Sequence, residues 1–141
     1  MEISKKIVDT ARGYIGTPWE HQGRHKVLGV DCIGLLICVA HEVFGIFHDV
    51  SDYDRMPDGT LLKMLDTYLD RIPFSEARIG DVVAMKFDDQ PHHVAILGDY
   101  LYGGFSIIHS FARSGKVIET RLTPEFQNLI VAYYRIKRVL E

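Results

Sequence analysis

Three residues of this sequence have the types that a cysteine-based reaction needs. Cys32 follows Asp31 at a point where a loop is expected to become a helix, and His93 and His109 follow far downstream. The first backbone N–H groups of a helix have no partner within the helix, and the helix dipole is positive there, so a thiolate is favoured at such a position. We therefore expect the pKa of the Cys32 thiol to lie below its ordinary value, and Cys32 to act as a nucleophile.

The second cysteine, Cys38, provides a contrast. It lies within the apolar run 35–40 and is expected to belong to the core. Six residues along a helix span about 9 Å, beyond the roughly 7 Å that a disulfide allows between Cα atoms, so we predict two free thiols. An unpaired cysteine is often only a small buried hydrophobe, and this alternative also applies to Cys32 when it is considered alone.

The two histidines are expected to face each other across a hairpin. Strands 93–97 and 105–109 are separated by the turn-rich segment 98–104, and a register symmetric about Leu101 places His93 opposite His109. Side chains directly opposed in an antiparallel pair share one face, with Cβ atoms about 4.5–5.5 Å apart. One imidazole can then orient the other while the other accepts the thiol proton. The alternative is that both are ordinary strand residues.

The elements that must position these residues fall into two groups. Apolar residues recur at helical spacing before Gly16, from the N-cap Asp31 to about Val43, and over 61–69. After Gly80 they occur in short runs between turn residues, which predicts five strands: 81–87, 93–97, 105–111, 116–121 and 129–136. We expect an α+β fold in which the helix of Cys32 packs on a five-stranded, largely antiparallel sheet.

Composition restricts the class of protein. The chain has 141 residues, 47% of them hydrophobic, which suits a single domain over 1–141 with a substantial core. A net charge of −3 with scattered Lys and Arg argues against a nucleic-acid partner. No apolar stretch approaches the roughly 20 residues of a membrane span, so we expect no membrane partner. The start has no continuous apolar segment, so we expect synthesis in the cytoplasm without a cleavable secretion signal.

Five short motifs together resemble the NlpC-type cell-wall peptidases, papain-like cysteine peptidases of bacterial peptidoglycan. They are Gly-Thr-Pro-Trp at 16–19, Asp-Cys-Ile-Gly-Leu at 31–35, Gly-Asp-Val-Val at 80–83, His-Val-Ala-Ile at 93–96 and Ile-His-Ser at 108–110. The resemblance implies a papain-like fold, a Cys32 nucleophile, a His93 base, an orienting His109 and no cofactor. It also implies that the backbone N–H of Cys32 helps to bind the oxyanion, and that the substrate is a stem-peptide amide, D-glutamyl to a diamino acid.

One position departs from the family pattern. Trp19 stands where the family usually has Tyr, and an indole offers only an N–H donor. Gln22 or His21 could supply the missing polar contact, while Trp19, Tyr53 and Asp31 are expected near the substrate groove. The segment 16–22 looks most like the variant encoded with phage tails and gene-transfer agents. Phage tail proteins are thus expected partners, with the protein associated with the virion or delivered to the cell wall.

Two further interpretations stay open. One Cys and two His are suitable zinc ligands, although no local pair has metal-site spacing. The substitution of Trp19 also suits a catalytically inactive domain that binds the cell wall or builds a phage tail.

Overall fold

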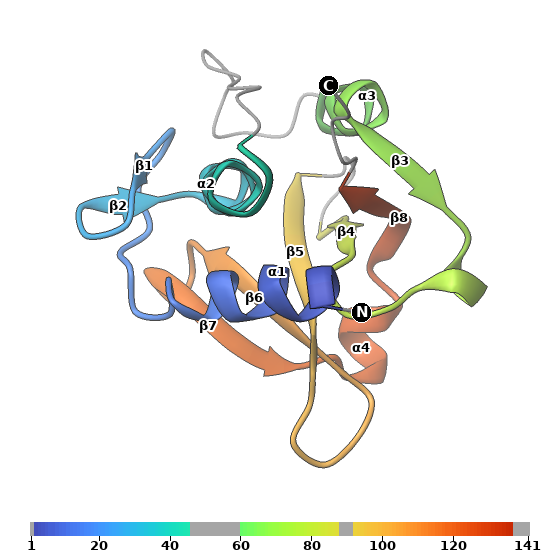
Figure 1. Ribbon diagram of the computed structural model, residues 1–141. Helices are drawn as coiled ribbons and strands as arrows, with labels where there is room; N and C mark the ends of the chain where they lie inside the picture. Colours follow the sequence, from blue (N-terminus) through green and yellow to red (C-terminus); the bar gives the residue numbers. More distant parts are fainter. Residues whose placement is uncertain (1, 46–59, 88–91, 137–141) are drawn as a thin grey trace.

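The computed structural model describes residues 2–45, 60–87 and 92–136 (Figure 1). Its helical elements are α1 (Glu2–Arg12), α2 (Cys32–Phe44), α3 (Thr60–Tyr68), the 3-10 turn η1 (Phe74–Glu76) and α4 (Pro124–Gln127). Its strands are β1 (Arg24–His25), β2 (Gly29–Val30), β3 (Leu69–Ile72), β4 (Val82–Met85), β5 (His93–Asp99), β6 (Phe105–Phe111), β7 (Lys116–Arg121) and β8 (Ile130–Ile136).

The main sheet has six strands in the order β3-β8-β4-β5-β6-β7, and every neighbouring pair is antiparallel. The α+β class is confirmed, but the expected number of five strands is wrong. The missed strand is β3, which pairs with β8 at the edge of the sheet. It is only four residues long and begins at Leu69, directly after α3, so the helical spacing of the preceding residues conceals it.

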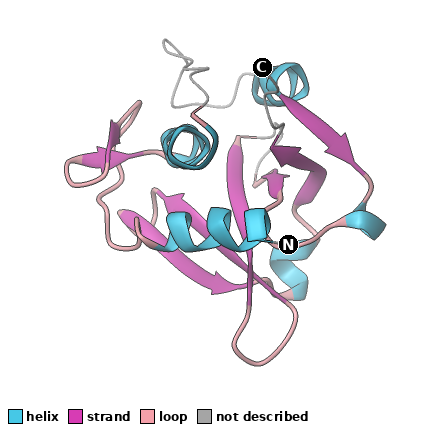
Figure 2. Ribbon diagram, viewed as in Figure 1, coloured by secondary structure: helices cyan, strands magenta, loops and turns pink. Residues whose placement is uncertain are grey.

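Helix α2 begins and ends where the sequence predicts. The Asp31 side chain accepts a hydrogen bond from the Gly34 N–H, which makes Asp31 the N-cap, and Gly45 ends the helix in the left-handed conformation. In Figures 1 and 2, α1 crosses in front of the sheet and α2 lies beside it, with the small β1–β2 sheet next to α2. This arrangement brings the first turn of α2 to the sheet.

Apolar side chains are buried on both faces of the sheet. On β5, Val94 and Ile96 pack with the buried residues of α1, α2 and α3, whereas Ala95 and Leu97 pack in a second cluster that includes Phe126 of α4. The alternation follows from the two-residue period of a strand. Because His93 has the same parity as Ala95, its ring lies on the side of the second cluster.

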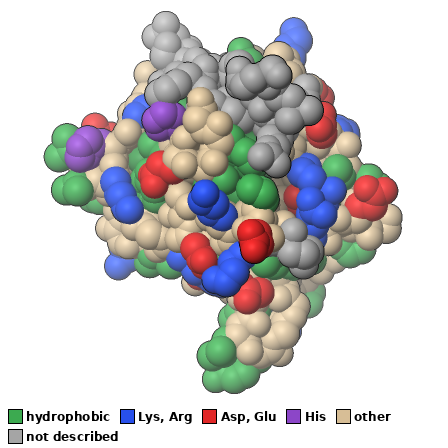
Figure 3. All heavy atoms as spheres, in the orientation of Figure 1, with side chains coloured by type: hydrophobic (Ala, Val, Ile, Leu, Met, Phe, Trp, Pro, Cys, Tyr) green, Lys and Arg blue, Asp and Glu red, His purple; other side chains and the backbone are tan. Residues whose placement is uncertain are grey.

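The outer surface carries charges of both signs. Figure 3 shows Lys and Arg side chains interspersed with Asp and Glu over the face in view. No helix within residues 2–45, 60–87 and 92–136 is long and apolar enough to cross a membrane.

Candidate active site

Cys32 is the first residue of α2 and is half-buried. Its Sγ lies 3.9 Å from the main-chain oxygen of His92. Hydrogen bonding from the N–H of Val94, together with the N–H groups of Ile33 and Cys32, favours the thiolate. The sulfur thus contacts the main chain of β5 on both sides of His93, although no hydrogen bond joins it to the His93 ring.

The expected lowering of the Cys32 pKa is wrong. Burial raises the pKa of the Cys32 thiol to about 12, and the carboxylate of Asp31 adds to the rise. The backbone N–H groups act in the opposite direction but do not outweigh these two effects. Desolvation therefore outweighs the effect of the helix start, and the neutral thiol is the favoured form of Cys32 at pH 7.

His93 and His109 are joined by a hydrogen bond of 2.7 Å between Nε2 of His93 and Nδ1 of His109. The register expected from loop symmetry is wrong by two residues, because Ile96 pairs with Ile108 and Leu97 with Ile107. A shift of two residues keeps every side chain on its own face. The two histidines are therefore diagonal neighbours on one face instead of directly opposed, and their rings still meet with centroids 4.9 Å apart.

Both imidazoles are buried and neutral. His93 is 5% exposed and His109 is 0% exposed. Burial lowers the pKa of His93 well below its ordinary value, with further lowering by His109 and His92, and burial alone lowers the pKa of His109 to about 4. Nδ1 of His93 makes no hydrogen bond within the described residues, so a neutral His93 that donates from Nε2 to His109 keeps a basic Nδ1.

Ser110 connects the strand of the histidines to the start of α2. Its hydroxyl donates a 2.7 Å hydrogen bond to the main-chain oxygen of Val30, two residues before Cys32. Val30 is fully buried and also pairs with the preceding loop, since its N–H donates to Pro18. The distance between β6 and the first turn of α2 is therefore fixed by direct bonds.

Asp31 organises the loop in front of α2. One carboxylate oxygen accepts from Gly34 N and the other from Gln22 N, each at 2.7 Å, while Arg24 lies 3.5 Å away. Asp31 is only 4% exposed, so its carboxylate is engaged by the protein. A Cβ atom on Gly34 would lie 2.0 Å from the main-chain oxygen of Gly23, which explains why glycine occupies this position of the helix.

The other expected groove residues are placed only in part. Trp19 is half-buried, its main-chain N–H donates to the main-chain oxygen of Gly115, and its backbone forms a β-bridge with Val30. Gln22 has a positive φ of 58°, and its N–H is the group that bonds Asp31. Tyr53 lies outside the described residues.

The described residues contain no group of three His, Cys, Asp or Glu side chains arranged to hold a metal ion. Cys32, His93 and His109 therefore do not form a zinc site in this geometry. Neither Cys32 nor Cys38 is in a disulfide, as predicted.

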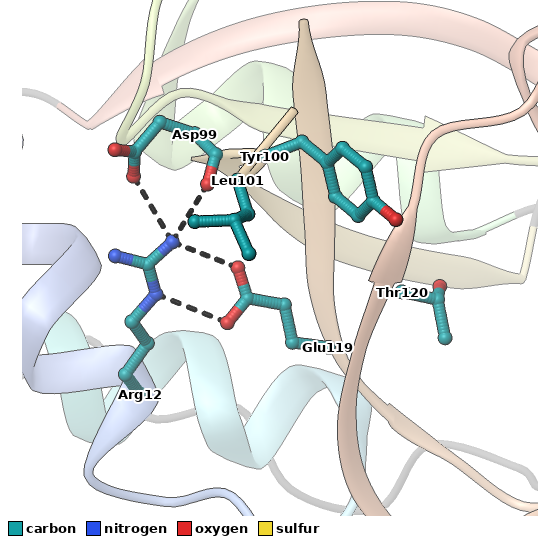
Figure 4. Close-up of a pocket in the computed structure, with 6 residues that line it drawn as sticks. All are labelled: Arg12, Asp99, Tyr100, Leu101, Glu119 and Thr120. Carbon is teal, nitrogen blue, oxygen red and sulfur yellow. Dashed lines mark hydrogen bonds and ion pairs between the residues drawn. The ribbon is translucent and has the colours of Figure 1, made fainter. Parts of the chain in front are cut away.

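A separate hollow of about 440 Å³ lies where the β5–β6 loop meets α1 (Figure 4). Arg12 reaches from α1 and bonds the carboxylates of Glu119 and Asp99. Ser106 donates to Glu119 as well, at 2.6 Å. These charged groups are hydrogen-bonded to one another, so the network joins α1 to the sheet.

Sequence reasoning missed the aromatic rings around the histidines. Phe87, Phe111 and Phe126 each lie within 6.5 Å of at least one of the two imidazoles, measured between ring centroids. Phe111 was detectable, since it follows His109 by two residues on one strand and must share its face. Phe87 and Phe126 come from other elements and carry no such signal.

A scan of family models matches residues 16–135 to NlpC/P60. The chain belongs to the NlpC/P60 family. The matched range holds Cys32, His93 and His109, and the papain-like fold expected from the motifs is confirmed. A search of curated proteins found no match.

Solved structures share the fold at low sequence identity. A Staphylococcus aureus protein described as similar to a lipoprotein of the NLP/P60 family has 23% identity and a TM-score of 0.67 over 96% of this chain. This chain spans 41% of that protein's length. The NlpC/p60 domain of the peptidoglycan hydrolase SagA has 24% identity and a TM-score of 0.66, covering 94% of this chain and 98% of that domain.

RipD of Mycobacterium tuberculosis shows that the fold also occurs without catalysis. It is described as a non-catalytic NlpC/p60 domain protein adapted to peptidoglycan binding. Its identity to this chain is 16% with a TM-score of 0.60, and 99% of each chain is covered.

Proposed function

We propose that this chain is a cysteine peptidase that hydrolyses a stem-peptide amide of bacterial peptidoglycan, with Cys32 as nucleophile, His93 as base and His109 as the residue that orients it. The observation that carries the proposal is the 2.7 Å bond from His93 to His109, on a strand whose preceding residue, His92, has its main-chain oxygen 3.9 Å from the Cys32 sulfur. This bond occupies Nε2 of His93 and leaves Nδ1 for the proton of the thiol. A nucleophile, a base and an orienting group are the parts that covalent catalysis requires.

The first step is attack by sulfur coupled to loss of its proton. Because the thiol is neutral and the imidazole is a weak base, a resting thiolate–imidazolium pair is disfavoured. Rotation of the Cys32 side chain away from the His92 carbonyl brings Sγ to the substrate carbonyl, and its proton passes to Nδ1 of His93 as the C–S bond forms. Backbone N–H groups at the start of α2 stabilise the oxyanion.

The second half of the reaction returns the enzyme to its first state. The tetrahedral intermediate collapses, the C–N bond breaks, and the leaving amine takes the proton from His93, which leaves a thioester on Cys32. Water then attacks the thioester carbonyl and gives its proton to His93, and the acid product departs as the thiol is restored. We propose the amide between D-glutamate and a diamino acid as the bond that is cleaved.

Cys32→Ala tests the proposal directly. Purified sacculi should lose turbidity with the unchanged protein, and the variant should release no new amines. Cys38→Ala is the matched control, because Cys38 lies on the same helix, packs against the core, and its Sγ lies 3.6 Å from the main-chain oxygen of Arg24, away from the histidines. Equal clearance by both variants would refute the role of Cys32.

The second candidate is a non-catalytic domain that binds the cell wall, and RipD supports it by showing that the fold can serve that function. Such a domain would sediment with sacculi and release no peptide, with or without Cys32. We further propose, from the motif at 16–22, that the protein reaches the wall with a phage-like tail, with Trp19 lining the substrate groove. Co-purification with tail particles would test the route.

A further inference from the structure

Three phenylalanine rings surround the histidine pair, and each comes from a different element. Phe87 follows β4, Phe111 ends β6 and Phe126 lies in α4. Phe111 stacks on His109 with centroids 5.2 Å apart and lies 5.6 Å from His93. Phe87 lies 5.4 Å from His93, and Phe126 meets His109 edge-on at 6.3 Å.

The rings also contact one another, so they form one aromatic cluster. Phe87 lies 5.7 Å from Phe111 and 6.5 Å from Phe126. All three are half-buried, whereas the two histidines are at most 5% exposed. Among the residues that the structure describes, the three rings therefore lie between solvent and the imidazoles.

We call the packing of these three rings around the histidine pair the enclosure. It has a cost in free energy, because it leaves a polar atom without a hydrogen bond. Nε2 of His109 is buried and has no hydrogen-bond partner. An unsatisfied buried polar atom costs on the order of a lost hydrogen bond, so its presence in a native structure calls for an explanation. A polar residue in place of one ring could satisfy Nε2, yet Phe111 and Phe126 pack against the His109 ring instead.

We propose that Phe87, Phe111 and Phe126 are positioning residues that keep water away from the bond between His93 and His109 and so hold His93 as an oriented base. A hydrogen bond gains strength in such a low-dielectric site, and the charged form of either ring is disfavoured there. The inference rests on the proposed function for its catalytic meaning only, since the enclosure itself is a structural property.

Few titratable groups near the histidine pair compete with the effect of burial on its protonation. His92 precedes the pair on the same segment and contacts Phe87, and α2 contributes the thiol of Cys32. Lys86 beside β4 and Glu125 in α4 are exposed. Within residues 2–45, 60–87 and 92–136, no carboxylate bonds either ring, so burial dominates the behaviour of the pair.

The test compares variants at one ring position. Phe111→Ser admits water beside both imidazoles, whereas Phe111→Leu keeps the site apolar. Phe105→Ser is the matched control, because Phe105 is the same residue type, lies on the same strand and face, is also half-buried, and packs away from the histidines. The readout is the pH titration of the His93 and His109 ring signals by NMR, assigned with His→Gln variants.

We expect Phe111→Ser to raise the titration midpoint of the pair by about one pH unit, with Phe111→Leu and Phe105→Ser close to the unchanged protein. Phe126→Ser, on a separate element, should act in the same direction and serves if Phe111→Ser does not fold. Unchanged midpoints in both polar variants would overturn the proposal, as would an equal rise in Phe105→Ser.

The acid limb of the pH–activity profile supplies a second readout. Activity of Phe111→Ser and Phe126→Ser should be lost at a pH about one unit higher than in the unchanged protein. If the midpoints move while no variant hydrolyses sacculi, the enclosure stands and the peptidase function fails. If the unchanged protein hydrolyses sacculi and the midpoints stay fixed, the function stands and the enclosure fails.

Discussion

Replacing Asp31 by Asn should make Cys32 more reactive and the protein less stable. The charge of Asp31 is the second cause, after burial, of the raised pKa of the Cys32 thiol. Removal of one adjacent charge lowers a thiol pKa by about one unit, which is about tenfold more thiolate at a fixed pH. Because burial persists, the thiol pKa should stay above its ordinary value.

The expected loss of stability follows from the number of acceptor oxygens, which is two in the Asp side chain and one in the Asn side chain. Asp31 uses both carboxylate oxygens, one for Gly34 N and one for Gln22 N, at 2.7 Å each. Asn has a single oxygen, so it can preserve the N-cap but must turn its NH₂ group toward one of the two donors. Losing one such charge-assisted bond costs about 1.5–3 kcal/mol.

The assay measures alkylation by iodoacetamide from pH 7 to pH 11, with peptide mass spectrometry to separate Cys32 from Cys38. In the unchanged protein, Cys32 labelling should still be rising at pH 10. In Asp31→Asn it should be about tenfold faster between pH 8 and pH 9, while urea denaturation shows the lost stability. A plateau for unchanged Cys32 near pH 8, or slower labelling in the variant, would refute the reasoning.

Three further predictions concern the supports of the site. Because the pKa of folded His109 is about 4, well below its ordinary 6.5, protons bind the unfolded state first as the pH falls through 6.5. Urea denaturation should thus show that His109 lowers the free energy of unfolding by about 3 kcal/mol between pH 7 and pH 4. His93 adds to the same pH dependence, so His109→Asn should remove only the part due to His109. An unchanged pH dependence in that variant would contradict the assignment. Gly34→Ala should displace the main chain at Gly23 and remove hydrolysis with a marked fall in Tm, and a crystal structure with an unmoved loop would count against the steric argument. Ser110→Ala should lower the unfolding free energy by about 1 kcal/mol, because it removes the hydrogen bond from the Ser110 hydroxyl to the Val30 oxygen. It should also reduce kcat more than it raises KM, because that bond holds the start of α2 to β6. Unchanged kinetics would show that the bond is dispensable.

The ends of several helices and strands were predictable because they depend on a few adjacent residues. Asp31 as N-cap, Gly45 as the left-handed C-cap and the strand that begins at His93 each follow from a few adjacent residues. Strand β3 was not, because it is short and lies at an edge, and its pairing with β8 depends on residues more than 60 positions away. The two-residue error in the β5–β6 register came from an assumed loop symmetry, yet the strand period kept both histidines on one face.

The sequence by itself determined which atoms are available: a thiol at a helix start and two imidazoles of equal parity on neighbouring strands. Only the tertiary structure decided their protonation, because desolvation depends on what surrounds a group and not on its neighbours in the chain. It raised the thiol pKa where the helix dipole alone predicted a fall, and it buried the imidazole pair behind aromatic rings. Chemistry that depends on charge is therefore set by packing from distant elements, which local sequence does not encode.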